Sequence, residues 1–251
     1  MRKCFVIINK TVIVTGASSG IGFAIAKAYL ARGYNVIGNS LRLKELEKAA
    51  VRLDHPPNFH LVAGDISKLD TVHKLFDYAE HNFGKIDIFI NNAGIFIAKP
   101  LTEYTESDIN RMIDINLRGF IYTAQSAAQH MSKNGGGHLV TLTAALAMQP
   151  NAKLSALLPV LTKGGLNSAV KTMALELAPF NIMVNAVAPG VIETPMHEGN
   201  EELKNSLKGM APTHRIGNPQ DIVNAVLYLT DSTFVTGTIL PVDGGSTAGT
   251  W

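Results

Sequence analysis

The 251-residue chain is poor in charged, aromatic and cysteine side chains. Only 17% of its residues are Asp, Glu, Lys or Arg and 46% are hydrophobic, whereas globular domains usually have about 25% charged residues. Disordered proteins have the reverse composition. The net charge of +2 is too small, and the charges too scattered, for the basic stripe of a nucleic-acid-binding protein. The low charge also suggests that other subunits cover part of the surface.

Cys4 is the only cysteine, which excludes an internal disulfide and a cysteine metal cluster. The histidines lack metal-ligand spacing, so no metal site is expected. The apolar run at residues 4–8 is shorter than the roughly 7–15 residues of a signal-peptide core, and no small-residue cleavage site follows it. No run approaches the roughly 18 apolar residues of a membrane span. We therefore expect a protein of the reducing cytoplasm, with no membrane or nucleic-acid partner.

Short apolar runs alternate with longer amphipathic stretches along the chain. The runs predict strands at Thr11–Thr15, Asn35–Gly38, Phe59–Ala63, Ile86–Ile90, His138–Leu142, Ile182–Ala188 and Thr238–Val242. The stretches predict helices at Ile21–Arg32, Leu41–Arg52, Leu69–Phe83, Glu103–Lys133, about Pro159–Leu177, Glu198–Lys208 and Pro219–Leu229. This alternation indicates βαβ units around a parallel sheet. No linker-like stretch divides the chain, so we predict an α/β fold, a single doubly wound domain over residues 1–251.

A glycine-rich turn separates the first predicted strand from the first predicted helix. Its three glycines permit a tight turn, close approach of a pyrophosphate and close packing of the helix on the strand. The N–H groups at the start of the helix bind phosphates. The turn therefore predicts a dinucleotide site formed by Gly16, Ser18, Ser19, Gly20, Ile21 and Gly22.

The G-x-x-x-G-x-G spacing of this turn resembles the short-chain dehydrogenase/reductase family. Further matches follow in order: the N-N-A-G at residues 91–94, Asn116, the P-G-x-I-x-T at residues 189–194, and C-terminal signatures at residues 215–217, 221–222, 235–237 and 242–245. The resemblance covers nearly the whole chain and implies one Rossmann domain in a dimer or tetramer. It also implies a catalytic role for Asn116 and cofactor contacts by Asn92, Ala93, Gly94, Pro189, Gly190, Ile192 and Thr194.

The end of the second predicted strand bears on the choice between NAD and NADP. Proteins of this fold that prefer NAD hold the ribose 2′-hydroxyl with an Asp or Glu roughly 20 residues beyond the glycine loop. No acidic residue occurs from Phe23 through Lys44, so nothing there repels a 2′-phosphate. Ser40 and Arg42, with Lys44, could donate to that phosphate, which favours NADP(H) over NAD. Alternatively, Arg42 and Lys44 only begin a solvated surface helix.

Asp65 and Ile66 follow the third predicted strand. The resemblance implies that they contact the adenine ring, with the Asp65 carboxylate accepting a hydrogen bond from the adenine amino group. Asp side chains also cap turns by bonding the backbone two residues on. This structural role is the alternative for Asp65.

The family's chemistry uses a tyrosine and a lysine four residues apart on one helix face. The resemblance places the lysine, which also binds the nicotinamide ribose, at Lys163, and the tyrosine position at Pro159. The family's tyrosine exchanges a proton with the substrate oxygen, and proline has no ionisable proton. In the enoyl-reductase variants of the family the tyrosine lies seven residues before the lysine, and that position is Ala156 here. No tyrosine lies between Tyr122 and Tyr228, so no shift of the alignment places a tyrosine near Lys163. Because proline clashes with a preceding helical turn, we expect Pro159 in the first turn of its helix.

The family's carbonyl-polarising serine is also missing. The strand that normally ends in two serines ends here in Thr143 and Ala144. The catalytic serine is usually the second of the pair, which corresponds to Ala144, so Thr143 supplies a hydroxyl only if the register of the loop shifts. The candidate catalytic residues are therefore Asn116, Lys163 and Thr143.

Four side chains are candidates for a replacement proton donor: Tyr104, Tyr122, His138 and His197. His197 follows the segment that borders the substrate in the family, and histidine titrates near neutral pH. The structural alternatives are an exposed loop histidine for His197, helix packing for Tyr122 and a strand start for His138.

Two functions fit these observations. The first is an NADP(H)-dependent oxidoreductase acting on a carbonyl/alcohol pair with a non-standard proton donor. The second is a catalytically inactive nucleotide-binding homologue that serves as a cofactor sensor or partner subunit. The substrate pocket is expected at Ile95–Lys99, Ala144–Ser155 and Ile192–Lys208, whose mostly apolar residues favour an apolar substrate.

Overall fold

A single parallel sheet forms the centre of the computed structural model, which describes residues 10–152, 154–193 and 201–250. The sheet has the strand order β3-β2-β1-β4-β5-β6-β7, and every neighbouring pair is parallel. Its strands are β1 (Thr11–Thr15), β2 (Asn35–Ser40), β3 (Phe59–Ala63), β4 (Ile88–Asn91), β5 (Gly137–Leu142), β6 (Ile182–Pro189) and β7 (Ile239–Val242). This confirms the predicted seven-stranded, doubly wound fold. Cys4, Thr194 and His197 lie outside the described residues.

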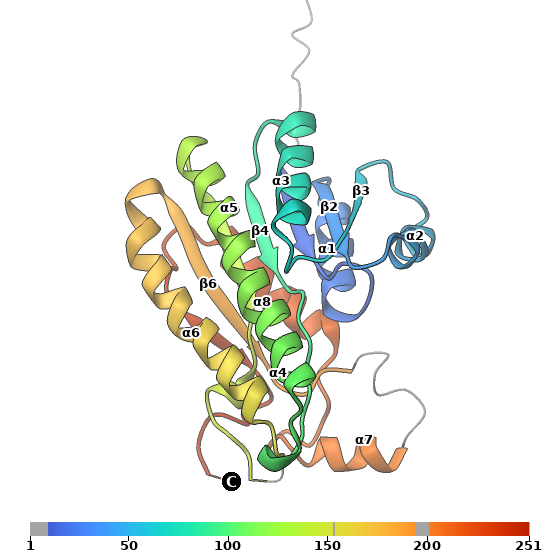
Figure 1. Cartoon of the computed structure of the whole chain (residues 1–251), viewed down its shortest axis with the longest axis vertical. Helices are drawn as coiled ribbons and strands as arrows, with labels where there is room; N and C mark the ends of the chain where they lie inside the picture. The colour runs from blue at the N-terminus through green and yellow to red at the C-terminus, as the bar shows by residue number, and fades with distance from the viewer. Residues whose placement is uncertain (1–9, 153, 194–200, 251) are drawn as a thin grey trace, which may run out of the picture.

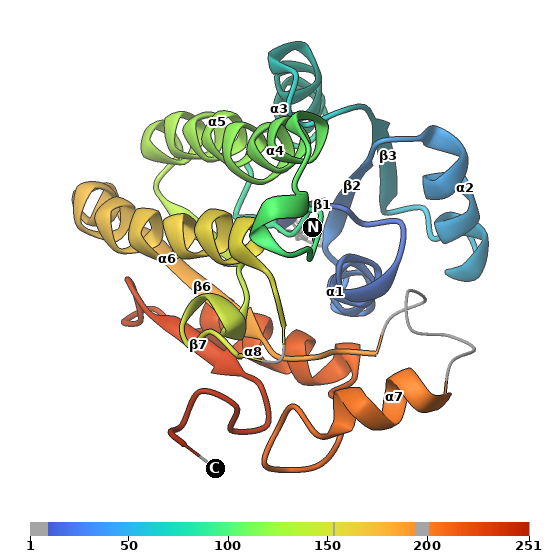
Figure 2. The same cartoon turned by 60° about the horizontal axis from the view of Figure 1, so that its bottom comes forward.

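Helices cover both faces of the sheet (Figure 1). They are α1 (Gly20–Ala31), α2 (Leu43–Arg52), α3 (Leu69–Phe83), α4 (Glu106–Met112), α5 (Gly119–Lys133), α6 (Leu157–Leu177), α7 (Glu201–Lys208) and α8 (Pro219–Asp231). Figure 2 shows α3, α5 and α6 on one side of the sheet and α1 and α8 on the other. Within the described part of the chain, no helix is long and apolar enough to cross a membrane.

A hydrophobic core lies on each face of the sheet, because successive side chains of β1 point to opposite faces. Val12 and Val14 belong to the cluster that packs under α1, α2 and α8, whereas Ile13 belongs to the cluster under α3, α5 and α6. Successive side chains of a strand point to opposite faces, so a strand covered on both sides must be apolar throughout. All five residues of β1 are accordingly buried.

The carboxyl ends of the strands meet at one edge of the sheet, where the predicted site residues lie. Gly16, Arg42, Asp65, Asn92 and Thr143 each follow a different strand, from β1 to β5. From β1 the strands β2 and β3 follow towards one edge of the sheet, and from β4 the strands β5, β6 and β7 follow towards the other. The direction of strand succession therefore reverses between β1 and β4, which are direct neighbours. In doubly wound sheets, ligands bind in the crevice outside such a reversal point.

The helix predicted over Glu103–Lys133 begins three residues later, at Glu106, and contains a π-helical turn. The segment consists of α4, a π-helical turn at Ile113–Arg118 and α5, and Tyr104 lies before the first of these. Thr105 begins α4 through a capping box, because its hydroxyl accepts from the N–H of Asp108 while the Asp108 carboxylate accepts from the N–H of Thr105. The apolar periodicity of the sequence does not change at the start of α4, so the T-x-x-D pattern of the capping box is the sequence signal for this helix start.

The remaining boundaries differ little from the prediction. The second helix begins at Leu43 instead of Leu41, and the fourth strand begins at Ile88 instead of Ile86. Helix α6 begins at Leu157, which places Pro159 in its first turn. The expectation for Pro159 is therefore confirmed.

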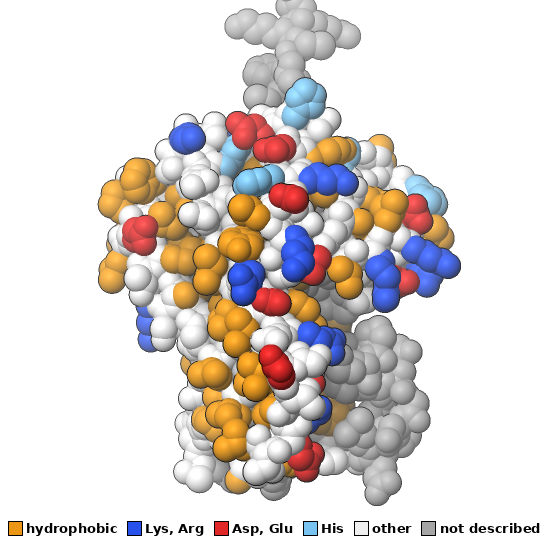
Figure 3. Space-filling model, in the orientation of Figure 1, with side chains coloured by type: hydrophobic (Ala, Val, Ile, Leu, Met, Phe, Trp, Pro, Cys, Tyr) orange, Lys and Arg blue, Asp and Glu red, His pale blue; other side chains and the backbone are white. Residues whose placement is uncertain are grey.

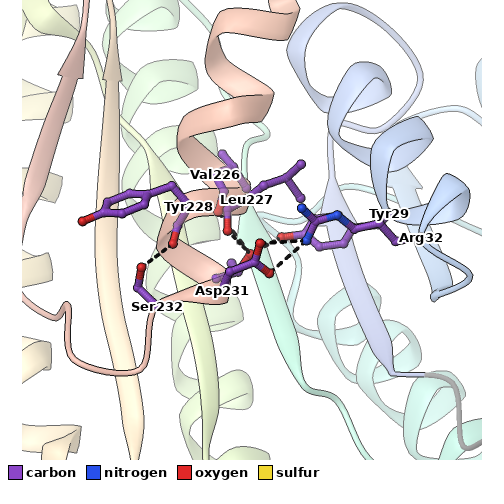
Figure 4. A network of polar contacts seen from close by, with 8 residues as sticks. Tyr29, Arg32, Val226, Leu227, Tyr228, Asp231 and Ser232 are labelled. Atoms are coloured by element: carbon purple, nitrogen blue, oxygen red, sulfur yellow. Dashed lines mark hydrogen bonds and ion pairs between the residues drawn. The ribbon is translucent and has the colours of Figure 1, made fainter.

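A polar contact joins α1 to α8 across their buried interface (Figure 4). The Tyr29 hydroxyl lies 2.7 Å from Oγ1 of Thr230, which itself donates to the carbonyl of Val226 at 3.1 Å. Tyr29 is therefore the donor of this pair, and burial raises the pKa of its phenol. At the exposed end of the interface, Arg32 pairs with Asp231 at 2.9 Å.

Tyr29→Phe is expected to lower the free energy of unfolding by about 1–2 kcal/mol, because it removes a buried hydrogen bond without changing the packing. Urea denaturation measures this change. Tyr228→Phe is the matched control, since 55% of Tyr228 is exposed and its loss of a hydroxyl should cost under about 0.5 kcal/mol. Equal effects of the two substitutions would contradict the role assigned to Tyr29.

Candidate active site

The glycine loop after β1 is shaped by positions that no side chain fits. Gly16 has a φ of 68° and Gly20 a φ of 53°, both in the left-handed region that favours glycine. A Cβ at Gly16 would lie 2.7 Å from Nδ2 of Asn92. A Cβ at Gly22 would overlap the Gly16 carbonyl oxygen and the same amide. The backbone of the loop and the start of α1 therefore pack directly on Asn92.

Thr15 and Asn92 tie this loop to the segment after β4. The Asn92 amide donates to the carbonyl of Thr15 at 2.9 Å and to that of Gly16 at 3.3 Å. The Thr15 hydroxyl accepts from the N–H groups of Asn92 and Ala93, each at 3.0 Å. Asn92 and Ala93 thus hold the edges of the crevice, and Thr15 is a site-forming residue that the sequence prediction omitted.

The start of α1 fits a pyrophosphate. Its first turn contains no acidic residue, and no side chain caps its N-terminal N–H groups. Ser18 is half-buried and Ser19, at the N-cap, is exposed. Free N–H groups and the positive end of the helix dipole bind anions, and the absent Cβ atoms at Gly16 and Gly20 let a ligand approach the backbone. These residues have the geometry that a dinucleotide requires.

The segment after β2 lies beside this loop. Ser40 is buried and its hydroxyl donates to the carbonyl of Arg42 at 3.2 Å, while Arg42 is exposed at the N-cap of α2. The helix start predicted as an alternative for Arg42 is therefore present, and it leaves the guanidinium at the surface. Such an exposed guanidinium can donate to a phosphate oxygen.

Asp65 is half-buried after β3, and its Oδ1 accepts from the N–H of Ser67 at 2.9 Å. The turn-capping alternative is thus observed for one carboxylate oxygen. The neighbouring Ile66 is buried against Gly119, where a Cβ would lie 2.8 Å from its Cδ1. Ile66 supports the floor of this part of the crevice.

Asn116 is buried within the π-helical turn and joins three segments. Its Oδ1 accepts from the N–H of Ile95 at 2.9 Å, and its Nδ2 donates to the carbonyl of Ile95 at 2.9 Å and to the hydroxyl of Thr162 at 3.2 Å. The loop after β4 is thereby fixed to the turn of α6 that carries the predicted lysine. The π-helical turn and the Thr162 contact are features that the sequence prediction missed.

Lys163 is half-buried, and its Nζ donates to the carbonyl of Leu142 at 2.7 Å. A Cβ at Gly94 would lie 3.3 Å from this Nζ and 3.1 Å from Oδ1 of Asn116, so the bare backbone of Gly94 lets the loop after β4 lie this close to the ammonium. Burial lowers the pKa of Lys163 to about 8. The structure therefore brings Gly94, Asn116 and Lys163 together, as predicted.

The two residues after β5 face different ways. Thr143 is buried, and its hydroxyl donates to the carbonyl of Val187 on the neighbouring strand at 3.3 Å. Ala144 lines the cavity beside the site. The hydroxyl of Thr143 is thus engaged with the sheet backbone, and the cavity wall at this point carries a methyl group.

Three of the candidate proton donors are engaged elsewhere. The Tyr104 hydroxyl donates to the carbonyl of Ile97 at 2.9 Å and accepts from the N–H of Lys99 at 3.4 Å. Tyr122 packs against the core under α5 and bonds to Arg118. His138 is the second residue of β5, at the end of the strand opposite to Leu142, and burial lowers its pKa. The fourth, His197, lies outside the described residues.

A cavity of about 470 Å³ adjoins the site. Its wall includes Phe96 and parts of the predicted stretch Ala144–Ser155, together with Pro189, Gly190 and Val191. The sequence prediction missed Ser246, Gly249 and Thr250, which also line the cavity. The Gln149 amide bonds the Gly249 carbonyl at 3.2 Å, so the C-terminal segment closes one side of the cavity. None of the described lining residues carries an ionisable side chain.

The segment after β6 completes the wall. Gly190 donates its N–H to the carbonyl of Val242 at 3.0 Å, and a Cβ at Gly190 would lie 2.7 Å from the Cα of Asp243. Ile192 is buried and packs against Gly217. Among the described residues, no group of three or more His, Cys, Asp or Glu could hold a metal ion.

Residues 16–247 match the family model described as enoyl-(acyl carrier protein) reductase. The chain is 34% identical over 247 residues to 3beta-hydroxysteroid dehydrogenase 1 of Eggerthella lenta, covering 95% of this chain and 94% of that one. These matches, with the glycine loop and the Asn116–Lys163 geometry, show that the chain belongs to the short-chain dehydrogenase/reductase family.

Solved structures agree with this assignment. The structure titled "ElxO with NADP Bound" superimposes with a TM-score of 0.90 at 27% identity, covering 96% of this chain and 100% of that chain. A 3-ketoacyl-(acyl-carrier-protein) reductase from Brucella melitensis, complexed with NADH, gives a TM-score of 0.88 at 28% identity, covering 95% of this chain and 98% of that chain. Both nicotinamide cofactors therefore occur among proteins of this structure.

Proposed function

We propose that this chain is an NADP(H)-dependent oxidoreductase that interconverts a carbonyl and an alcohol and works without the tyrosine of its family. The observation that carries the proposal is the contact of Lys163, beside the bare backbone of Gly94, with Leu142, two residues before Ala144, which lines the 470 Å³ cavity. A lysine held at that point can reach both a nucleotide in the crevice and a substrate in the cavity. Relatives such as the Eggerthella lenta protein are named as dehydrogenases, which supports the reaction class.

The chain's own residues would hold the cofactor at four places. The N–H groups from Ser18 to Gly22 bind the pyrophosphate, Asp65 and Ile66 flank the adenine, and Lys163 binds the nicotinamide ribose. Pro189, Gly190 and Ile192, with Thr194, border the nicotinamide. When bound, the reduced nicotinamide supplies a hydride to a carbonyl carbon.

The choice of NADP over NAD rests on the segment after β2. Exposed Arg42 provides a cation beside the ribose position, and no acidic residue from Phe23 through Lys44 opposes a 2′-phosphate. The NADP-bound ElxO structure supports this choice, and the NADH-bound Brucella protein shows that it needs a direct test.

The competing proposal is a nucleotide-binding protein without turnover, a cofactor sensor or partner subunit. Pro159 and Ala144 at the tyrosine and serine positions favour it. The half-buried Lys163 with a pKa of about 8 favours the enzyme instead, because a group that titrates near neutrality can exchange protons during a reaction.

A binding and turnover experiment distinguishes the two. NADPH and NADH binding are followed by nucleotide fluorescence, and NADPH oxidation is followed against ketones, aldehydes, quinones and enones. The enzyme proposal predicts tight NADPH binding together with oxidation by at least one carbonyl compound. Tight binding without oxidation by any of them would establish the non-catalytic alternative.

We also propose that the chain self-associates as a dimer or tetramer through the α5–α6 surface, defined by Ile121, Leu175, Phe180 and the groove between the two helices. Ile121 is 57% exposed, Leu175 82% and Phe180 50%. Figure 3 shows hydrophobic side chains gathered over these helices. The groove has a volume of about 580 Å³ and small residues, Ala124 and Ala128, along its floor. A second copy of the same surface would bury these side chains.

Ile121→Lys is expected to weaken self-association by about 100-fold or more, because an unpaired ammonium would be buried in the interface. Light scattering over a concentration series should show a smaller particle for this variant than for the wild type. Val51→Lys on α2, where the wild-type side chain is 61% exposed, is the matched control and should leave the particle mass unchanged. A monomeric wild-type chain would contradict the proposal.

Two further expectations stay predictions: that residues 1–251 form one domain, and that the protein is located in the cytoplasm.

A further inference from the structure

The proposed function leaves one chemical role unassigned, the proton that must reach the substrate oxygen. Tyr104 is bonded at both Ile97 and Lys99, and Tyr122 is packed against the core. His138 lies at the far end of β5. The described residues that line the cavity contribute no acid of their own. The titratable group described beside Gly94 and Asn116 is the ammonium of Lys163.

We propose that Lys163 itself donates the proton to the substrate oxygen, taking the place of the missing tyrosine. This inference rests on the proposed oxidoreductase function and identifies the acid within that same site. It makes Lys163 a catalytic residue in addition to a holder of the ribose.

The surroundings of Nζ permit this role. An ammonium has three N–H donors, and the contact with the carbonyl of Leu142 at 2.7 Å uses one of them. Ala144, two residues after Leu142 on the chain, lines the cavity, so the carbonyl that holds Nζ lies at the strand end from which this part of the cavity wall continues. The bare backbone of Gly94 leaves a second side of Nζ without a covering side chain. Among the described residues Nζ makes no second hydrogen bond, so two of its donors are left for a ligand.

Among the described residues, the groups packed around Nζ are uncharged. They are the carbonyl of Leu142 from β5, the backbone of Gly94 from the loop after β4, and the amide of Asn116 from the π-helical turn. The Thr162 hydroxyl, which precedes Lys163 on α6, bonds to that amide and to the carbonyl of Leu158. With no carboxylate partner in the described part of the chain, burial disfavours the charged amine, and the pKa falls to about 8.

The step balances as follows. The carbonyl carbon accepts a hydride, which carries two electrons, and the C=O bond becomes a single bond. The carbonyl oxygen takes one proton from Nζ of Lys163 to become a hydroxyl, and the neutral amine then takes a proton from water. The net reaction consumes one reduced cofactor and one proton for each alcohol formed.

The sign of the pH dependence follows from this role. Reduction requires the ammonium, whose fraction falls tenfold for each pH unit above its pKa. We therefore expect kcat for reduction to be constant below about pH 8 and to decline above it. Oxidation of the alcohol requires the neutral amine and should rise over the same interval.

The test begins with the chain free of cofactor. Lysine side chains labelled with nitrogen-15 are titrated by NMR, and Lys163→Arg assigns the signal of Lys163 by its loss. The inference predicts a titration midpoint near 8 for this signal. A midpoint near the ordinary lysine value of about 10.4 would overturn it, whatever the activity.

The second arm is kinetic and uses the full chain with saturating NADPH. Lys163→Arg retains a positive charge for NADPH binding but cannot release a proton, so kcat should fall by about 10²–10⁴ and lose its break near pH 8. Lys171→Arg, an exposed lysine further along α6, is the matched control and should leave kcat and the pH profile unchanged. NADPH binding is measured for each variant by fluorescence.

The outcomes separate this inference from the proposed function. If Lys163→Arg binds NADPH and keeps the wild-type kcat and pH break, Lys163 is not the donor while the oxidoreductase stands. If His197→Ala removes the pH break and Lys163→Arg does not, the donor is His197. If no carbonyl compound oxidises bound NADPH, the proposed function and the inference both fail.

Discussion

Gly22→Ala is expected to abolish most of the cofactor affinity of this protein. The new methyl group would overlap the Gly16 carbonyl oxygen and the Asn92 amide, so the start of α1 must move away from the glycine loop. A displaced helix start loses several N–H bonds to a phosphate, each worth roughly 1.5–3 kcal/mol when the acceptor is charged. The Kd for NADPH should therefore rise by about 100-fold or more. Fluorescence titration with NADPH measures the change.

The same substitution should lower the free energy of unfolding by about 1–3 kcal/mol, the usual cost of overpacking. Gly165→Ala on α6 is the matched control, because a Cβ there would lie 3.9 Å from Leu117, its nearest neighbour. Alanine in an exposed helical position should raise the stability by roughly 0.5–1 kcal/mol. An unchanged NADPH affinity in Gly22→Ala would show that the loop does not bind the pyrophosphate.

Arg42→Asp is expected to reverse the preference between the two cofactors. The guanidinium lost would have donated to the 2′-phosphate, and the carboxylate introduced repels that phosphate while it can accept from a ribose 2′-hydroxyl. The ratio of the Kd values for NADPH and NADH should change by about 100-fold in favour of NADH, which corresponds to roughly 2.7 kcal/mol.

The matched control for this reversal is Lys27→Asp. Lys27 is an exposed cation on α1, and its replacement makes the same change in net charge. It should shift both affinities slightly and leave their ratio intact, since surface charges beyond about 10 Å are largely screened at 0.1 M salt. A wild-type chain that binds NADH better than NADPH would contradict the role given to Arg42.

The fold could be predicted because its signals are local and repeated. The β-branched run Thr11–Thr15 is buried throughout, and such runs alternate with amphipathic helices along the chain. The start of the long helix at Glu106 and its π-helical turn could not be read from periodicity. The start depends on the Thr105–Asp108 capping box, and the π-helical turn contains the buried amide of Asn116, which bonds Ile95 in another segment.

The sequence predicted which residues form the site better than it predicted the contacts that these residues make. Gly94, Asn116 and Lys163, which the family resemblance implied as site residues, lie together, and the glycine loop packs on Asn92. The engagement of the Thr143 hydroxyl with Val187 depends on the twist of two strands, which a single sequence does not contain. The closure of the cavity by Gly249 depends likewise on a long-range contact with Gln149.

The transfer of hydride from the cofactor to a carbonyl carbon is the central claim, and isotope labelling tests it most directly. NADPH carrying deuterium at the transferable position of its nicotinamide is incubated with the wild-type chain and a carbonyl compound that oxidises NADPH in the turnover assay. Mass spectrometry of the product then follows the label. The account predicts one deuterium bound to carbon in the alcohol. An alcohol without deuterium, or bound NADPH that no carbonyl compound oxidises, would contradict it.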